Sequence, residues 1–201
     1  MEPARGNFLY DDVLPRVMQI GWPLVMLGVI FRFMLLQGGS MLLMVGIGTL
    51  AVVYYLRAFA PSAFTNEDFY TNYEPVPNSP ANFLLHAVAP KVQGIATAVC
   101  LIGTLFKLLV WTGATMLLLI GVLCLAIVLA IHVFNSLRSN ELLLFLAIGS
   151  TMLLIPTDDI IRRFYRDDPY LVEKMIFQHH HPHDRAAQTE VLRLLHARHG
   201  R

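Results

Sequence analysis

The sequence predicts an all-α membrane protein with two parallel-repeat transmembrane helical hairpins, four spans in all, followed by amphipathic cytoplasmic C-terminal helices. Its composition, its long apolar segments and an internal repeat lead to this prediction. Of 201 residues, 56% are hydrophobic and only 14% are charged, whereas about a quarter of a typical soluble domain is charged. The net charge of +1 gives no indication of a nucleic-acid partner. The lipid bilayer is therefore the first partner we expect.

Four long apolar segments are the candidate spans: Val17 to Leu36, Met41 to Phe59, Val92 to Val110 and Ala114 to Phe134. Each is about 20 residues long, enough for a helix to cross a hydrocarbon core of about 30 Å. The first segment is too long for the apolar part of a signal peptide and has no small-residue cleavage site after it, so we expect it to remain as an anchor. Cys100 and Cys124 lie inside spans, where we expect small core residues rather than a disulfide.

The spans belong to an internal repeat. Placing residues 13–62 over residues 88–137 needs no gap, has an offset of 75 and gives 15 identities in 50 positions. The identities include glycines and prolines, which chance matches between leucine-rich helices rarely supply. Each unit has two spans, so both units enter the membrane from the same side. The repeats are therefore parallel, and a transporter built from inverted repeats is disfavoured.

Four glycines are the candidate helix-packing residues. Gly28 and Gly46 in the first unit have Gly103 and Gly121 as counterparts in the second. Small residues let helix backbones approach closely in lipid, where no hydrophobic force drives helices together. We therefore expect two close antiparallel helix pairs, each closed by a short glycine-containing turn.

Basic residues predict the orientation of the hairpins. Arg5, Arg16, Arg57, Lys91 and Arg138 flank the ends that share a side with the N-terminus, whereas the turns LQGGS and WTGAT carry no Lys or Arg. The positive-inside rule places such basic ends in the cytoplasm. The sequence thus predicts a multi-pass membrane protein with the N-terminus and the 60–91 loop in the cytoplasm.

The chain after the second hairpin begins with a short apolar segment. Leu142 to Ile155 has 14 residues, a length more typical of interfacial, re-entrant or buried helices than of spans. Crossing would also put the basic tail outside, against the charge rule. We therefore favour a segment that does not cross, with a fifth short membrane segment as the open alternative, and we expect a cytoplasmic tail. Ile160, Ile161 and Phe164 alternate with arginines as in a helix lying on the membrane surface, and residues 186–198 form a second amphipathic stretch.

The chain therefore divides into four parts: a first hairpin (1–62), a cytoplasmic loop (63–87), a second hairpin (88–137) and a tail (138–201) that holds the short helix and a basic, His-rich end. The loop contains several prolines, aromatic residues and acids. Two interpretations stay open for it, a surface connection or a docking surface for a partner.

Arg32 and Lys107 are the candidate intramembrane charges, and they occupy matching positions of the repeat. Ionisable groups within spans are costly and often functional. Each lies about six residues before its turn, close enough for a long side chain to reach the boundary or a helix end. Both alternatives stay open. The spans contain no Asp or Glu to pair with these cations, which argues against an autonomous ion-driven machine.

The remaining chemistry is sparse. His179, His180, His181 and His183 are weak candidates for a metal site, because imidazoles suit zinc, copper or nickel but Pro182 interrupts their geometry. No phosphate-binding loop, nucleophile elbow or spaced zinc signature is present. We expect no cofactor and no enzymatic activity.

A glycine-bearing first span, "LFK" at its end, a short turn and a second span opening on "ML" resemble the N-terminal membrane domain of the gliding-motility protein L (GldL) family. The segment "LRAFAPSAFTNEDFYTNYEPV" is similar to the family's acidic, aromatic linker. The resemblance covers the two hairpins, about half of the chain. It implies an inner-membrane protein of gliding, type 9-secreting Bacteroidota, in which hairpins from several copies surround a partner's single span and work as a proton-driven stator.

The resemblance places the family's first-span Lys at Arg32 and Lys107, but the family's second-span Glu has no counterpart here. The chain also lacks the family's long cytoplasmic coiled coil. We therefore expect a GldL-like, non-enzymatic scaffold or interaction subunit that packs against other transmembrane helices or copies of itself. The alternative is a small transporter or channel subunit in which Arg32 and Lys107 face a polar cavity.

Overall fold

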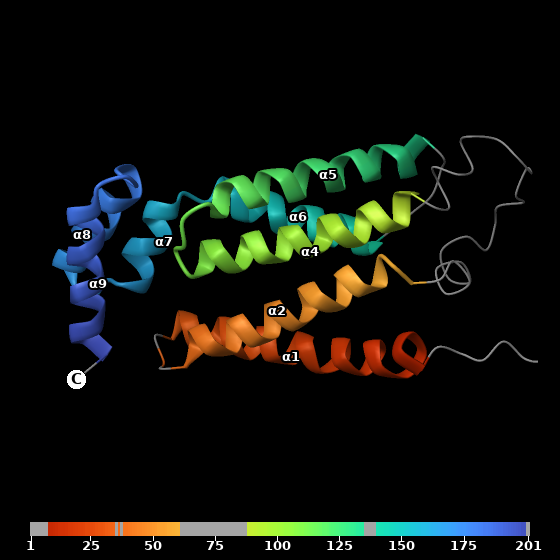
Figure 1. Ribbon diagram of the computed structural model, residues 1–201, viewed down its shortest axis with the longest axis horizontal. Coiled ribbons are helices and arrows are strands. Elements are labelled where there is room, and N and C mark those ends of the chain that lie inside the picture. The colour runs from red at the N-terminus through yellow and green to blue at the C-terminus, as the bar shows by residue number, and fades with distance from the viewer. Residues whose placement is uncertain (1–7, 35, 37, 61–87, 135–139, 200–201) are drawn as a thin grey trace, which may run out of the picture.

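The computed structural model describes residues 8–34, 36, 38–60, 88–134 and 140–199 (Figure 1). All regular structure within them is helical. The elements are a π-helical turn η1 (Leu9–Val13) and the helices α1 (Leu14–Phe33), α2 (Gly39–Arg57), α4 (Ala89–Leu108), α5 (Ala114–Phe134), α6 (Asn140–Leu154), α7 (Thr157–Phe164), α8 (Pro169–His180) and α9 (Arg185–His199). Helices α1, α2, α4 and α5 are long and apolar enough to cross a membrane. The protein is thus a multi-pass membrane protein by helix length and composition.

The two hairpins, α1–α2 and α4–α5, begin and turn at corresponding positions. Helices α1 and α4 each have 20 residues and start and end 75 positions apart, and α5 starts 75 positions after α2. Gly38 and Gly113, in the two turns, have φ angles of 89° and 84°, which L side chains rarely adopt. In Figure 1, α1 and α4 run in the same direction and α2 and α5 return.

Corresponding glycines also bring each helix pair together. A Cβ atom added at Gly28 would lie 2.9 Å from the backbone nitrogen of Leu43, and one added at Gly103 would lie 2.8 Å from that of Leu118. Leu43 and Leu118 are themselves 75 positions apart. Both hairpins therefore use the same backbone approach near the turn.

The second glycine of each unit makes a similar approach nearer the middle of the spans. A Cβ at Gly46 would lie 2.9 Å from the backbone nitrogen of Val25, and one at Gly121 would lie 2.8 Å from the Cα atom of Cys100. Val25 and Cys100 are again 75 positions apart. These contacts are with backbone, so a side chain at either glycine would force the helices apart.

Helix α4 lies at the centre of the bundle. It packs on α5, α2 and α6, whereas α1 packs mainly on α2 at one edge. Half of the apolar window of α4 is buried inside the protein, but only 17% of that of α1. Gly94 permits the contact between the hairpins, because a Cβ there would lie 2.8 Å from Ala58 Cβ and from the Tyr54 carbonyl oxygen. The outer helices therefore leave long apolar faces for lipid or other helices.

Helix α6 differs from the expectation of a segment that stays at one surface. At its start, Glu141 Oε2 lies 3.6 Å from Arg57 Nη1 at the end of α2. Near its end, the carbonyl oxygen of Leu153 lies 3.5 Å from Lys107 Nζ at the end of α4. The helix thus runs along the bundle from one end to the other (Figure 1). Helix α6 alone is shorter than the four candidate spans, but with α7 it forms a bent pair of the kind seen in broken spans and re-entrant loops. Helices α4 and α5 pack on one side of α6, where Leu142 and Phe145 are fully enclosed.

After α6 the chain bends by 82° into α7. Pro156 causes the break, because the residue before a proline disfavours helix and proline has no N–H to donate. Helices α7, α8 and α9 therefore lie at the end of the bundle that holds the two hairpin turns, which we call the turn end (Figure 1). The expectation that the tail shares a side with the N-terminus is wrong for this arrangement, because α6 carries the chain to the opposite end.

Helices α8 and α9 form a small pair with its own core. Leu171, Met175 and Val191 are buried between them, together with Ile161 of α7. The Glu190 carboxylate accepts a hydrogen bond from the Tyr170 hydroxyl at 2.7 Å and lies 3.4 Å from Lys174 Nζ, and these donors hold its pKa below the ordinary value. Helix α9 confirms the predicted amphipathic stretch. The predicted loop 63–87 lies outside the described residues.

Replacing Gly46 by Ala should destabilise the first hairpin. The added methyl group meets the backbone of Val25, and such overpacking costs roughly 1–3 kcal/mol. Gly48→Ala is the matched control, because a Cβ at Gly48 meets nothing within 4 Å. Unfolding of the purified protein in mixed detergent micelles measures both; equal stability of the two variants would contradict the proposed role of Gly46.

Candidate functional site

Lys107 lies buried near the turn end of the bundle. It occupies the last turn of α4, its side chain is 2% exposed, and its Nζ donates to the carbonyl oxygen of Leu153 at 3.5 Å. A cation near a helix C-terminus is also favoured by the helix dipole. The ammonium group of Lys107 thus links the last turn of α4, which carries the lysine, to the end of α6.

The carbonyl of Leu153 needs this donor because α6 ends there. In a continuous helix it would accept from the backbone N–H four residues later, but that residue, Thr157, already begins α7 beyond the bend. A carbonyl left without a donor away from water costs free energy. Lys107 therefore stabilises the α6–α7 break, which we call the elbow and define as residues 153–157.

Arg32 lies at the matching position of the first hairpin but contacts the end of α7 rather than the elbow. Its Nη1 donates to Ser40 Oγ at 3.1 Å across the hairpin turn. Its guanidinium carbon lies 4.6 Å from the ring centroid of Phe164 and 5.7 Å from that of Tyr165, within the range of cation–π attraction. The Nε atom of Arg32 is buried and has no partner among the described residues.

Both predicted intramembrane cations therefore hold the bent α6–α7 segment, Lys107 at the end of α6 and Arg32 at the end of α7. Of the two open alternatives, these contacts correspond to the helix-end contact. Neither of the two pockets described below is lined by Arg32 or Lys107.

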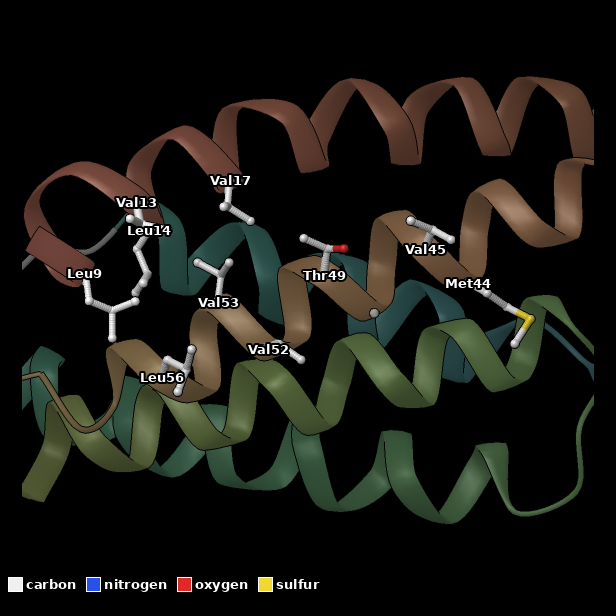
Figure 2. Close-up of a pocket in the computed structure, with 11 residues that line it drawn as sticks. Leu9, Val13, Leu14, Val17, Met44, Val45, Thr49, Val52, Val53 and Leu56 are labelled. Carbon is white, nitrogen blue, oxygen red and sulfur yellow. The ribbon is translucent and has the colours of Figure 1, made fainter.

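An apolar groove lies between α1 and α2 toward the N-terminal end. Its volume is about 510 Å³. In Figure 2, Leu9 and Leu14 extend from the first helical segment toward Val53 and Leu56 of α2. The full lining is aliphatic except for one glycine and one threonine: Leu9, Val13, Leu14, Val17, Met44, Val45, Gly48, Thr49, Val52, Val53 and Leu56. The groove lies beside the close backbone contact of Gly46 with Val25.

Gly48 gives the groove an open stretch of backbone. A Cβ atom there would have no neighbour within 4 Å, and the adjacent Thr49 adds a hydroxyl to the lining. Position 123, the counterpart of Gly48 in the second hairpin, is a leucine that is 59% exposed. The groove is therefore a feature of the first hairpin at a position where the repeat units differ.

The four histidines of the predicted weak metal cluster do not converge. His180 Nε2 lies 2.9 Å from Asp158 Oδ2 and joins α8 to α7. The Nδ1 of His181 lies 3.1 Å from the carbonyl oxygen of Phe177, and His179 and His183 are exposed. Among the described residues, no three His, Cys, Asp or Glu side chains are placed to hold one metal ion.

The two cysteines are free thiols. Cys100 is buried where α4 meets α5 and α6, and Cys124 is half-buried on α5. The sequence therefore predicted the apolar surroundings of both cysteines. It did not indicate the partners of the cations, because Ser40, Leu153 and Phe164 carry no motif and are brought near only by the fold.

Comparison with known proteins gives no match: no family model matches the chain, and neither does a curated protein or a solved structure.

Replacing Lys107 by Met should loosen the elbow while leaving the helices in place. The carbonyl of Leu153 would lose its donor, at a cost of roughly 1–3 kcal/mol, so amide exchange of residues 150–157 should become faster. Lys91→Met, at an exposed position near the start of the same helix, is the matched control. Hydrogen exchange measured by mass spectrometry tests this; unchanged exchange in Lys107→Met would contradict the role assigned to the lysine.

Proposed function

We propose that this protein is a non-enzymatic interaction subunit of a membrane complex, and that the groove between α1 and α2 receives a transmembrane helix of another protein. The observation that supports this is the open backbone at Gly48 inside an aliphatic groove. Small residues that expose backbone, with a neighbouring hydroxyl, are the features by which helices associate in lipid. An acyl chain has neither a backbone to pack there nor a group that could hydrogen-bond to the hydroxyl.

The position of α1 supports the same proposal. It packs mainly on α2 and leaves most of its apolar surface uncovered, with Ile20, Met26 and Met34 at least 60% exposed. An edge hairpin of this kind has free surface on both sides of the groove. A partner helix can therefore reach the groove without displacing any described helix of the bundle.

The class of complex that we propose follows from the residues that resemble the GldL family. In that family, hairpins surround a partner's single span in membrane assemblies for gliding motility or type 9 secretion of Bacteroidota. We propose a role related to such an assembly, without the motor activity, because the spans lack the acidic residue of the family. The proposed relation to such an assembly is supported by the resemblance of the two hairpins and the linker to the GldL family.

The alternative of a transporter or channel subunit needs cations that face a water-filled path. Lys107 is instead enclosed and bonded to Leu153, and Arg32 is stacked on Phe164 and bonded to Ser40. These contacts indicate that both side chains stabilise the packing of this chain. They favour the interaction subunit over transport.

The fold also bears on the orientation. The predicted cytoplasmic N-terminus rests on the basic residues that flank the end of the bundle opposite the turns, whereas α6 carries the tail to the turn end. The positive-inside rule counts Lys and Arg within about 20 residues of the span ends. Four residues lie within that range after α6, against five at the other end: Arg162, Arg163, Arg166 and Lys174, against Arg5, Arg16, Arg57, Lys91 and Arg138. We therefore keep the proposal that the N-terminal end faces the cytoplasm.

Fusions to the C-terminus test this orientation. With a cytoplasmic N-terminal end, alkaline phosphatase, which needs export, should be active after Arg201, and a fluorescent protein that folds only in the cytoplasm should be dark there. Fusions in the 63–87 segment should show the reverse. A bright fluorescent protein after Arg201 would instead place the turn end in the cytoplasm.

Cross-linking tests the groove. A photoreactive residue at position 49 should give adducts with a second membrane-spanning protein, and Gly48→Leu, which places in the groove the residue type found at position 123, should reduce them at least fivefold. Ala126→Leu, a small-to-large change on the exposed face of α5, is the control. Adducts with lipid alone, or adducts that persist in Gly48→Leu, would contradict the proposal.

A further inference from the structure

A second pocket lies at the turn end, between α7 and the end of α1. Its volume is about 470 Å³, and its lining is Phe33, Asp159, Arg162, Arg163 and Arg166. Three guanidinium groups thus face one carboxylate. This excess of positive charge is a site for an anion.

The arginines are available for a ligand. Arg162 and Arg163 are exposed on the polar face of α7, whose opposite face is buried through Ile160, Ile161 and Phe164. Arg166 has one ion pair, with Asp167 at 3.7 Å, in which its side chain is 72% exposed. Such exposed pairs contribute little, so an anion with better geometry can displace them.

The wall formed by Phe33 makes the pocket amphipathic. Its ring lies 5.7 Å from that of Phe164 and 5.7 Å from the guanidinium carbon of Arg163. Met26, Ile30 and Phe33 are spaced by four and three residues and are 60%, 49% and 53% exposed. They therefore form one apolar face of α1 that leads up to the arginines.

The bend places this pocket at the level of lipid headgroups. Helix α7 turns by 82° from α6, so when the spans lie along the membrane normal, α7 lies close to the membrane plane, as interfacial amphipathic helices do. The charged side of the pocket then faces headgroups, and the Met26–Phe33 face lies beside acyl chains.

We propose that this pocket binds an anionic phospholipid, with the phosphate between Arg162, Arg163 and Arg166 and an acyl chain along Met26, Ile30 and Phe33. Guanidinium groups bind phosphate oxygens through two parallel hydrogen bonds. The carboxylate of Asp159 in the lining leaves the three arginines with two net positive charges for the phosphate. The bound lipid would fasten α7 to α1 and so add to the contacts that Arg32 makes with Phe164.

Native mass spectrometry of the detergent-purified protein tests the site with phosphatidylglycerol, phosphatidylcholine of the same chains, and inorganic phosphate. We expect phosphatidylglycerol to bind at least tenfold more tightly than phosphatidylcholine. Arg162→Gln/Arg163→Gln should weaken phosphatidylglycerol binding roughly thirtyfold, about fivefold for each arginine. Arg185→Gln/Arg193→Gln, which removes the same charge from exposed positions of α9, should leave binding unchanged.

Phe33→Ala separates the lipid from a free anion. It should weaken phosphatidylglycerol binding and leave the weak binding of inorganic phosphate as it is. Circular dichroism of each variant shows that the helices persist. Equal binding of the two phospholipids, equal losses in the α7 and α9 double variants, or competition by millimolar inorganic phosphate would each overturn the proposal.

Discussion

The carbonyl groups at the end of α6 set the constraint on which the rest of the turn end depends. In an apolar medium a backbone carbonyl must find a donor within the protein. The bend at Pro156 takes the N–H of Thr157, the donor that a continuous helix would supply, away from the carbonyl of Leu153. Lys107 supplies a donor from another helix. With that contact made, the chain can bend by 82° and lay α7 across the end of the bundle. The position of α7 in turn creates the arginine pocket beside Phe33 and gives Arg32 an aromatic surface to stack on.

The two hairpins show how equivalent residues take different partners. Arg32 and Lys107 occupy matching positions, yet one is half-buried at the edge of the bundle and the other is enclosed at its centre. The difference follows from packing, because α4 is covered by α2, α5 and α6, whereas α1 packs mainly on α2. Lysine, a compact charge, suits a single carbonyl, and the planar arginine suits a stacked contact with a ring. The central hairpin therefore supports the elbow, and the edge hairpin is left with a free surface.

That free surface is compatible with a stable hairpin because glycines let the backbones of α1 and α2 approach and leucines of α2 fill the space beside them. Leu43 lies against Gly28 and Leu50 against Gly21, and both leucines are fully buried. Gly46 marks the close approach, and two residues later Gly48 faces open space in the groove. The face of α2 that carries Gly46 thus packs on α1, while the face that carries Gly48 stays available. The spacing of two residues is enough, because successive helical positions differ by about 100° in direction.

The sequence by itself determined the all-helical class, four spans, the packing glycines and the helix-end location of both cations, since these depend on segment length, residue size and position along one helix. The repeat offset of 75 also gave matching helix starts. Only the tertiary structure decided that α6 runs the length of the bundle, that α7–α9 lie at the turn end, and that Leu153, Phe164 and Ser40 meet the cations. Residues more than 40 positions apart, such as Lys107 and Leu153, leave no local pattern. Their contact exists because two other helices bury a segment too short to be recognised as a span.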